Sequence, residues 1–476
     1  MIHNGRRKIF TDVSEVNDEN VLDVVTDAMR VHQDNVNDIT YLYDYYRGIQ
    51  PILQRVKAVR PEINNHVLEN RANEIVSFKS GYLMGEPMQY VSRSEENSME
   101  VNDLNTFVFA EEKSSKDKEL SDWLHICGIG IRVVLPDLEG EEDESPFELY
   151  TVDPRDGFVV YSSDLSHKPV LGVVCYRDEK NCVHATCYSK NRSFVIDGNE
   201  LVASEPHVLG DVPVIEYQLN TPRMGAFEPV IPLLDAINTV ASNRVDSIEQ
   251  FVQAIMVFTN VDLTDDMFKR MRSDGAIKIA DLDDNKKAGI SYLTAVLNQQ
   301  ENQVLVEHMY NSVLTICGMP NRNGGSSTSD TGSAVMLRDG WSAAEARAKD
   351  SELWFKLSER KLLKVILQIC KIKKAFSLRV CDVDIRFTRR NYENIAQKST
   401  VLTQMLGCEK IHPKLAFQHS GMFPDPDLAY TISKEYTDEQ SLSRESLTGD
   451  SGEDFEDSQE GESSGAEDRE SGDRSD

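Results

Sequence analysis

The sequence predicts an α+β protein in which long helices and a run of short strands occupy separate parts of the chain. Two stretches, residues 226–258 and 332–373, carry apolar side chains every three or four positions, which is the spacing of one helix face. Between residues 128 and 219 the pattern changes to short apolar segments separated by turn residues such as Asp153-Pro154. Residues 441–476 are rich in Ser, Glu, Asp and Gly, so we expect them to be disordered.

The net charge restricts the classes of function. The 476 residues carry a net charge of −29 and are 40% hydrophobic, which fits a soluble folded protein with a sizeable core. Segment 441–476 has 13 acidic and 3 basic residues, so it contributes −10 and leaves −19 for the rest of the chain. Conventional DNA binding by counterion release needs clustered Lys and Arg and is therefore disfavoured. Such a charge would instead suit a surface past which DNA moves without adhering.

Cysteine usage and hydropathy indicate a protein of a reducing compartment that does not span a membrane. No two cysteines have the CxxC spacing, and no window approaches 18 uninterrupted apolar residues. Basic residues 6–8 are not followed by an apolar run, so no secretory signal peptide is expected. The eight cysteines are Cys127, Cys175, Cys182, Cys187, Cys317, Cys370, Cys381 and Cys408.

The first 225 residues are expected to contain helices followed by an antiparallel β region. Residues 1–36 are polar and contain one short helix over 21–31. A Tyr-rich helix over 37–48 ends at Gly48, because a glycine readily closes a helix. Further helices are predicted over 64–83 and 104–126, and strands over 88–92, 130–135, 147–152, 157–161, 170–176, 183–188 and 212–217.

Two antiparallel helices around a small αβ insert are predicted to form a stalk. The first helix covers 226–258, the insert covers 259–300 with a strand near Ile290, and the returning helix covers 301–318. The apolar stripe of the first helix includes Val245 and Ile248. Its polar face consists of Asn243, Arg244, Asp246, Glu249, Gln250 and Gln253.

A Gly- and Ser-rich loop, residues 319–331, connects the stalk to the next helix. Its hydroxyl and amide groups could contact a phosphate backbone weakly, with Arg322 as the cation, although an ordinary linker would have the same composition. The candidate contact residues are Asn321, Arg322, Asn323, Gly324, Gly325, Ser326, Ser327, Thr328 and Ser329.

The helix over 332–373 is the longest predicted element. At about 1.5 Å per residue it would span on the order of 60 Å. Gly340 is the expected position of a bend. A strand over 383–387 and helices over 394–406, 412–418 and 426–434 are predicted to follow.

The sequence offers no catalytic motif, and we predict neither catalytic residues nor a metal or cofactor. The chain lacks a GxxxxGK[ST] phosphate loop, an HExxH zinc helix and a GxSxG nucleophile turn. Cys182, His184 and Cys187 do not form a ligand set, because alternation along a strand directs Cys187 to the opposite face. Asp382 and Asp384 have the spacing of a metal-binding pair but no supporting ligands nearby.

The order of these elements resembles the portal proteins of long-tailed bacteriophages, over roughly residues 37–437. Four local segments are also similar to that family, although their order is more specific than any one of them. These segments are Ser80-Gly-Tyr-Leu-Met-Gly-Glu-Pro87, Thr331-Gly-Ser-Ala-Val-Met-Leu-Arg338, Asp384-Ile-Arg-Phe-Thr-Arg-Arg-Asn391 and Phe423-Pro-Asp-Pro426.

The resemblance implies a portal fold that assembles into a twelve-fold ring at one capsid vertex, with a central channel for double-stranded DNA. It assigns residues 37–225 and part of the long helix 332–373 to a mixed α/β wing, and 226–258 and 301–318 to a two-helix stem. It further implies an N-terminal extension (1–36), a clip (259–300), a tunnel loop (319–331), a helical crown (374–440) and an acidic tail (441–476).

The resemblance also implies the partners of the protein. The clip would dock the large terminase subunit during packaging and the head–tail adaptor afterwards, and major capsid and scaffolding proteins would surround the ring. The protein would reside in the virion, and in the host cytoplasm during assembly, without membrane contact. The candidate docking residues of the clip are Lys269, Arg270, Arg272, Asp283, Asp284, Lys286 and Lys287.

Two other interpretations remain open at the level of sequence. A cytosolic scaffold or adaptor could use the long helices as a coiled coil and would form dimers or trimers instead of a ring. An enzyme acting through Asp382, Asp384 or the Cys/His strand would bind metal or show hydrolysis.

Overall fold

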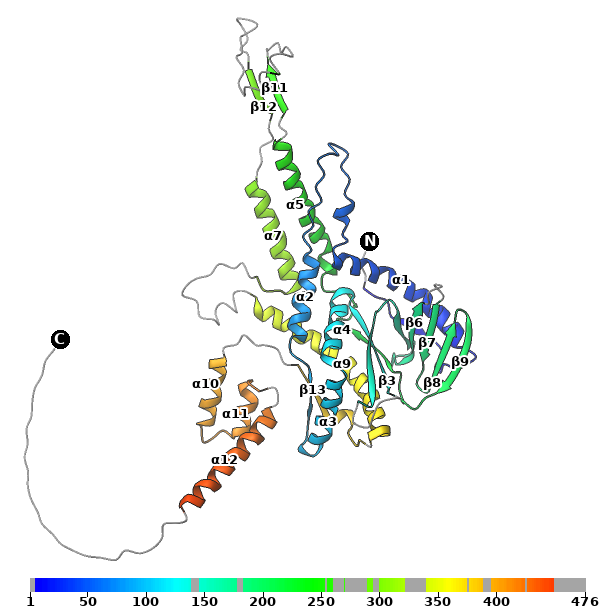
Figure 1. Ribbon diagram of the computed structural model, residues 1–476, viewed down its shortest axis with the longest axis vertical. Helices are drawn as coiled ribbons and strands as arrows, with labels where there is room; N and C mark the ends of the chain where they lie inside the picture. Colours follow the sequence, from blue (N-terminus) through cyan, green and yellow to red (C-terminus); the bar gives the residue numbers. More distant parts are fainter. Residues whose placement is uncertain are drawn as a thin grey trace, which may run out of the picture. The chain divides into compact units, whose positions relative to one another are not determined.

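The computed structural model describes residues 5–137, 145–177, 183–252, 255–259, 269, 289–293, 299–321, 340–374, 376–387, 395–423 and 426–448 (Figure 1). The chain divides into two compact units, Met1–Asn394 and Ile395–Asp476. The first unit contains two main sheets, the long helix and the pair of helices predicted to form the stem, and the described part of the second contains three helices.

A six-stranded sheet receives its first strand from the N-terminus. β1 pairs parallel with β5, and the other neighbouring strands pair antiparallel. The strands lie in the order β1 (Ile9–Thr11), β5 (Gly157–Ser162), β6 (Pro169–Arg177), β7 (Val183–Tyr188), β8 (Arg192–Asp197) and β9 (Glu200–Pro206). The first turns of α1 (Val21–Arg47) pack on this sheet, burying Val21 and Val24 beside Phe158.

Residues 5–36 are an integral part of the first unit, which corrects the prediction of a separate extension over 1–36. Helix α1 continues through the predicted boundary between 36 and 37 because it contains no Pro or Gly. Polar His32 and Asn35 interrupt its apolar pattern, yet both are buried: His32 Nε2 lies 2.9 Å from the Arg155 carbonyl, and Asn35 Oδ1 accepts from the Arg7 amide. Gly48 ends α1 as predicted, with a left-handed φ of 97°.

A three-stranded sheet and four helices enclose the largest core. Phe147, Leu149 and Tyr217 of this sheet pack against Phe355 and Leu362 of α9. The sheet has the order β10 (Val214–Gln218), β3 (Ile129–Pro136), β4 (Phe147–Val152), and the helices are α2 (Arg71–Met84), α3 (Ser98–Ala110), α4 (Lys113–Cys127) and α9 (Trp341–Lys374). β2 (Gln89–Ser92) pairs antiparallel with β13 (Val383–Arg386), and this pairing joins two distant parts of the chain. Two short 3-10 helices lie nearby: η2 (Glu95–Asn97) precedes α3, and η4 (Val380–Asp382) precedes β13.

Three helix boundaries differ from the expectation. The predicted helix over 104–126 is two helices, because Glu112 has a left-handed φ of 48° that interrupts the helix. The helix expected from residue 64 begins at Arg71, where the Asn70 side chain caps it by accepting from the Asn73 amide. Gly340, where a bend was predicted, lies immediately before α9 and has a left-handed φ of 84°, so it does not bend this helix. Residues 331–339 lie outside the described part.

The stem helices, α5 (Ile231–Val252) and α7 (Gln299–Cys317), contact one another, and η3 (Glu228–Val230) precedes α5. Their ends nearest the wing contribute Leu234, Ile237 and Val313 to a core shared with α1, α2 and α4. At their other ends, β11 (Ile255–Thr259) pairs antiparallel with β12 (Gly289–Leu293), so the strand expected near Ile290 is present (Figure 1).

The second unit consists of α10 (Ile395–Leu406), α11 (Pro413–Ser420) and α12 (Pro426–Thr448). The Lys398 ammonium donates to the Gly421 carbonyl at 3.0 Å, and the rings of Phe417 and Phe423 stack at 5.4 Å. α12 runs past residue 434, where its end was predicted, and past the predicted start of the tail at 441. Residues 449–476 lie outside the described part.

Acidification from pH 7 to pH 5 is expected to lower the free energy of unfolding, because a histidine is buried in its neutral form. Burial, followed by the charge of Lys79, lowers the pKa of His125 in α4 to about 3. The unfolded chain therefore binds a proton below about pH 6.5 that the folded chain does not bind, which costs about 1.4 kcal/mol per pH unit. Urea unfolding at pH 7 and pH 5 should show a loss of about 2 kcal/mol.

The matched variant for this experiment is His125→Gln, which cannot take up the proton. Its stability should depend on pH less steeply than that of the wild type over the same interval. Equal pH dependence in the two proteins would exclude His125 as the cause.

Candidate functional site

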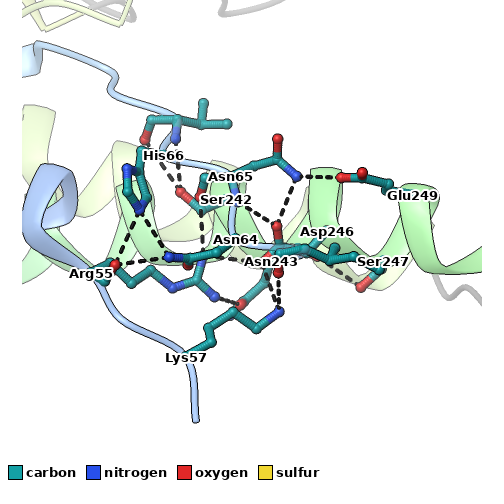
Figure 2. A network of polar contacts seen from close by, with 12 residues as sticks. Arg55, Lys57, Asn64, Asn65, His66, Ser242, Asn243, Asp246, Ser247 and Glu249 are labelled. Carbon is teal, nitrogen blue, oxygen red and sulfur yellow. Dashed lines mark hydrogen bonds and ion pairs between the residues drawn. The ribbon is translucent and has the colours of Figure 1, made fainter. Parts of the chain in front are cut away.

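A loop from the N-terminal half covers one side of the polar face of α5. This stem loop, residues 55–67, follows η1 (Pro51–Gln54) and lies along the helix (Figure 2). Because it contains Pro61 and no apolar period, the sequence does not continue as a helix here. Asn64 Nδ2 donates to the Arg55 carbonyl at 2.9 Å and Lys57 Nζ donates to the Ile63 carbonyl at 3.0 Å, so the loop is closed on itself.

Asp246 is the centre of the contact between the stem loop and α5. Its carboxylate lies 3.2 Å from Arg55 Nη1 and 3.0 Å from Lys57 Nζ, and accepts from the Asn65 amide at 2.8 Å. Only 2% of the residue is exposed. Burial alone would raise the pKa of this carboxyl, but the hydrogen bonds from Asn65 and Lys57 lower it below its ordinary value. Asp246 therefore remains ionised and holds both cations.

Other polar side chains of α5 bind the stem loop on either side of Asp246. Ser242 Oγ accepts from the Val67 amide at 3.0 Å, and Glu249 Oε2 accepts from Asn65 Nδ2 at 2.9 Å. Asn243 Oδ1 accepts from Arg55 Nη2 (Figure 2). These contacts extend along α5 and attach the loop at several points.

Arg244, on another side of α5, contacts the second stem helix. Its Nη1 donates to Gln303 Oε1 of α7 at 2.8 Å. A groove of about 570 Å³ lies beside this contact, among α2, α5 and α7. Within it the Arg71 guanidinium lies 4.3 Å from the ring of Tyr310, whose hydroxyl donates to Glu74 at 2.9 Å. α7 is thus fixed to both α5 and the wing.

The predicted polar face of α5 therefore makes two separate contacts. Asp246 and its neighbours bind the stem loop, and Arg244 binds α7. Asp246 was expected to face DNA or solvent, and this is wrong for the chain described: the stem loop buries it. Gln250 is half-buried, and Gln253 lies outside the described residues. The sequence feature that indicates the stem loop is the group of cations Arg55, Lys57 and Arg60, which lie close together in a strongly acidic chain.

Two of the predicted tunnel-loop and clip residues, Asn321 and Lys269, lie in the described part of the chain. Asn321, which follows α7, donates from Nδ2 to Oδ1 of Asn311 within that helix at 3.2 Å. Lys269 is exposed. The remaining candidates lie outside the described residues: Arg322, Asn323, Gly324, Gly325, Ser326, Ser327, Thr328, Ser329, Arg270, Arg272, Asp283, Asp284, Lys286 and Lys287.

The residues considered for metal chemistry have structural partners where the structure describes them. His184 Nδ1 lies 3.3 Å from Asp197 in the neighbouring strand, and Cys187 is buried. Asp382 accepts from the Arg379 guanidinium at 2.9 Å. Among the described residues, no three His, Cys, Asp or Glu side chains are grouped so that they could hold a metal ion. Cys182 lies outside that part of the chain.

A cluster of buried charges in the wing was not predicted from the sequence. Lys113 Nζ lies 2.7 Å from Asp117 in the same helix and 2.9 Å from Glu359 of α9, and Arg132 of β3 also pairs with Asp117. All four side chains are buried. Lys113 and Asp117 have i,i+4 spacing, which usually marks an exposed ion pair, so their burial could not be predicted from local spacing.

Replacing Asp246 by Asn is expected to release the stem loop from α5. The variant keeps the size of the side chain but removes the charge that Arg55 and Lys57 contact, so we expect a loss of about 1–3 kcal/mol. Hydrogen exchange should accelerate at the Asn65 and Val67 amides, which donate to α5 in the wild type.

The control for this variant is Asp27→Asn, which removes an exposed ion pair with Arg30 in α1. It should change stability by less than about 0.5 kcal/mol and leave exchange in the stem loop unaltered. If the two variants behaved alike, Asp246 would not hold the loop.

The described part of the first unit is a mixed α/β body from which two packed helices lead to a small β ribbon (Figure 1). The family model of phage portal proteins of the SPP1 Gp6-like type matches residues 29–447 of this chain. The chain therefore belongs to that family, a siphophage-type portal family of head–tail connector proteins. A search of the curated proteins finds no match.

Family membership has general consequences for assembly and location. Portal proteins are structural and non-catalytic, and they form homo-oligomeric rings that meet capsid and terminase partners at a vertex of the virion. None of the helices in the described part of the chain is both long and apolar enough to cross a membrane.

Proposed function

We propose that this protein forms a ring of about twelve subunits at one capsid vertex and that double-stranded DNA is packaged and ejected through its centre. The observation that carries the proposal is the stem, two packed helices that leave apolar side chains uncovered at the ends distant from the wing core. Val245 and Ile248 of α5 and Val304 and Leu305 of α7 are exposed, whereas Leu234, Ile237 and Val313 near the wing are buried.

The exposed apolar residues of the stem need a partner. In a monomer they face water, and their burial would contribute about 25 cal/mol per Å². A ring built from heterologous contacts covers such residues on every subunit, because each subunit offers one side of its stem to each neighbour. The net charge of −29 is consistent with a wall that repels packaged DNA and lets it slide.

The proposed roles of the other segments follow the family order. Residues 319–331 form the tunnel loop, whose hydroxyl and amide groups contact the DNA backbone as it moves. Residues 259–300 form the clip, which docks terminase during packaging and the head–tail adaptor afterwards. Reversing the charge of Lys269, Lys286 and Lys287 in the clip should then weaken terminase binding in a pull-down while rings still assemble.

Negative-stain electron microscopy combined with a light-scattering mass tests the ring. We expect annular particles with a central hole and a mass of about a dozen subunits. Elongated dimers or trimers would contradict the proposal and favour a coiled-coil scaffold. If the isolated protein is monomeric, the same images of particles assembled with capsid and scaffolding proteins decide the question.

A further inference from the structure

The tip of the stem loop exposes apolar side chains although the loop is firmly attached to α5. This apolar tip consists of Val56, which is 88% exposed, and Val59, which is 78% exposed. Arg55 and Lys57, on either side of Val56, turn inward to Asp246. Isolated exposed valines are common, but two of them on one pinned loop form a surface that favours a partner.

The conformation of the tip is fixed before any partner arrives. Lys57 Nζ donates to the Ile63 carbonyl, which ties the two arms of the loop together. Arg60 has a left-handed φ of 53°, an uncommon conformation for a residue other than glycine, and its guanidinium lies 4.0 Å from Glu62. A preorganised tip binds with a smaller entropy cost than a flexible one.

The outward face of α7 is complementary to this tip. Val304, 61% exposed, and Leu305, 47% exposed, lie on that face beside exposed Glu301. α7 contains Glu301 and Glu307 but no Lys or Arg. In the loop, Arg55 and Lys57 are bound to Asp246, which leaves Arg60, beside Glu62, as the cation near the tip that can meet these carboxylates. Apolar contact and the attraction between Arg60 and acidic α7 therefore both favour pairing of these two surfaces.

The two surfaces lie on different sides of the stem, so within one subunit they do not cover each other. The stem loop binds Ser242 and Asp246, while α7 binds Arg244. Residues 242 and 244 are separated by about 200° around a helix. Figure 1 likewise shows the loop and α7 on opposite sides of α5. A ring needs this arrangement, because each subunit must offer complementary surfaces on opposite sides.

We propose that the apolar tip of one subunit docks on the outward face of α7 in the neighbouring subunit of the ring. This inference rests on the proposed function, since it assigns the partner surface within that ring. Glu301 and Glu307 of the neighbour then lie near Arg60 of the loop, and the contact locks adjacent stems at a fixed height.

The variant Val56→Glu/Val59→Glu tests the docking. Both side chains are exposed in the monomer, so the folded subunit should keep its circular dichroism and melting temperature. We expect the variant to remain monomeric by light scattering at concentrations where the wild type forms rings, because carboxylates would meet acidic α7. The matched control, Leu165→Glu, changes a fully exposed residue of the β5–β6 turn and should assemble normally.

Cysteine cross-linking tests the contact directly. In a Cys381→Ser chain, mild oxidation of Val56→Cys/Leu305→Cys rings should produce a ladder of linked subunits on a denaturing gel. Val56→Cys/Leu353→Cys, which uses an exposed residue of α9, should give no ladder. The comparison of the two cysteine pairs separates a specific contact from random collision.

The outcomes distinguish this inference from the function on which it rests. If the wild type forms rings, the glutamate variant forms the same rings and the Val56→Cys/Leu305→Cys rings give no cross-linked ladder, the docking is overturned and the portal function stands. Rings that form normally but fail to enter capsids would assign the tip to a capsid or motor partner and also overturn it. A wild type that forms no ring, alone or with capsid and scaffolding proteins, would reject the proposed function itself.

Discussion

Replacing Glu359 by Gln is expected to destabilise the wing by about 3–5 kcal/mol. Glu359 is fully buried in α9, where it accepts from the hydroxyls of Tyr90 and Tyr217 at 2.5 Å each and pairs with Lys113 at 2.9 Å. The amide of Gln can still accept from a tyrosine, but it cannot balance the charge of Lys113.

The cost arises because the buried charges of the cluster are balanced in the wild type. Lys113 and Arg132 face Asp117 and Glu359, so losing one carboxylate leaves an excess positive charge without water.

Urea unfolding of the wild type, Glu359→Gln, Lys113→Met, the double variant and the control Lys349→Gln tests the cluster. Lys349→Gln breaks an exposed i,i+4 pair with Glu345 in the same helix and should cost less than about 0.5 kcal/mol. The double variant Lys113→Met/Glu359→Gln restores the balance of charge and should be less destabilised than the sum of the two single variants. Additive losses would show that Lys113 and Glu359 do not interact.

Replacing Arg6 by Met is expected to cost a similar amount, about 3–5 kcal/mol. Both side chains of the ion pair between Arg6 and Glu228 are fully buried, with 2.7 Å between Nη2 and Oε1. Arg6 Nη1 also donates to the Cys127 carbonyl at 3.0 Å. The variant would leave the Glu228 carboxylate buried with the Gly225 amide, 2.8 Å away, as its remaining polar contact among those described.

The neighbouring residue supplies the control for this experiment. Arg7 pairs with Asp34 at 3.3 Å, but both side chains are largely exposed, so Arg7→Met should change stability by less than about 0.5 kcal/mol. Thermal unfolding of the two variants compares equal changes in composition at adjacent positions. Similar melting temperatures would mean that the N-terminal segment does not contribute to the fold as we describe.

Local patterns predicted most of the described helices and strands in their correct order, but not the strands β1, β8, β9 and β11. In the β region between residues 128 and 219, apolar side chains recur at every second position, and in the two stem helices they recur every three to four positions. Both periods depend only on side chains within one segment. The predictions failed where a segment gains its order from elsewhere, as in α1, where His32 and Asn35 look exposed in sequence but are buried by partners more than 25 residues away.

The candidate site was less predictable than the fold. The polar face of α5 was recognised, but not that the stem loop covers Asp246, because loop and helix lie 181 positions apart at Asn65 and Asp246. The ordinary sequence signal of a docking surface is an apolar run, whereas the apolar tip alternates Val56 and Val59 with cations.

By itself the sequence determined the α+β class, the order of the β region, the paired helices and the long helix, and the acidic character of the chain. Each of these depends on composition or on neighbours along one element. Only the tertiary structure decided which charges are buried and which apolar residues are left exposed. Arg6 and Glu228 meet across 222 positions, and such pairing depends on how the elements pack, which no local period encodes.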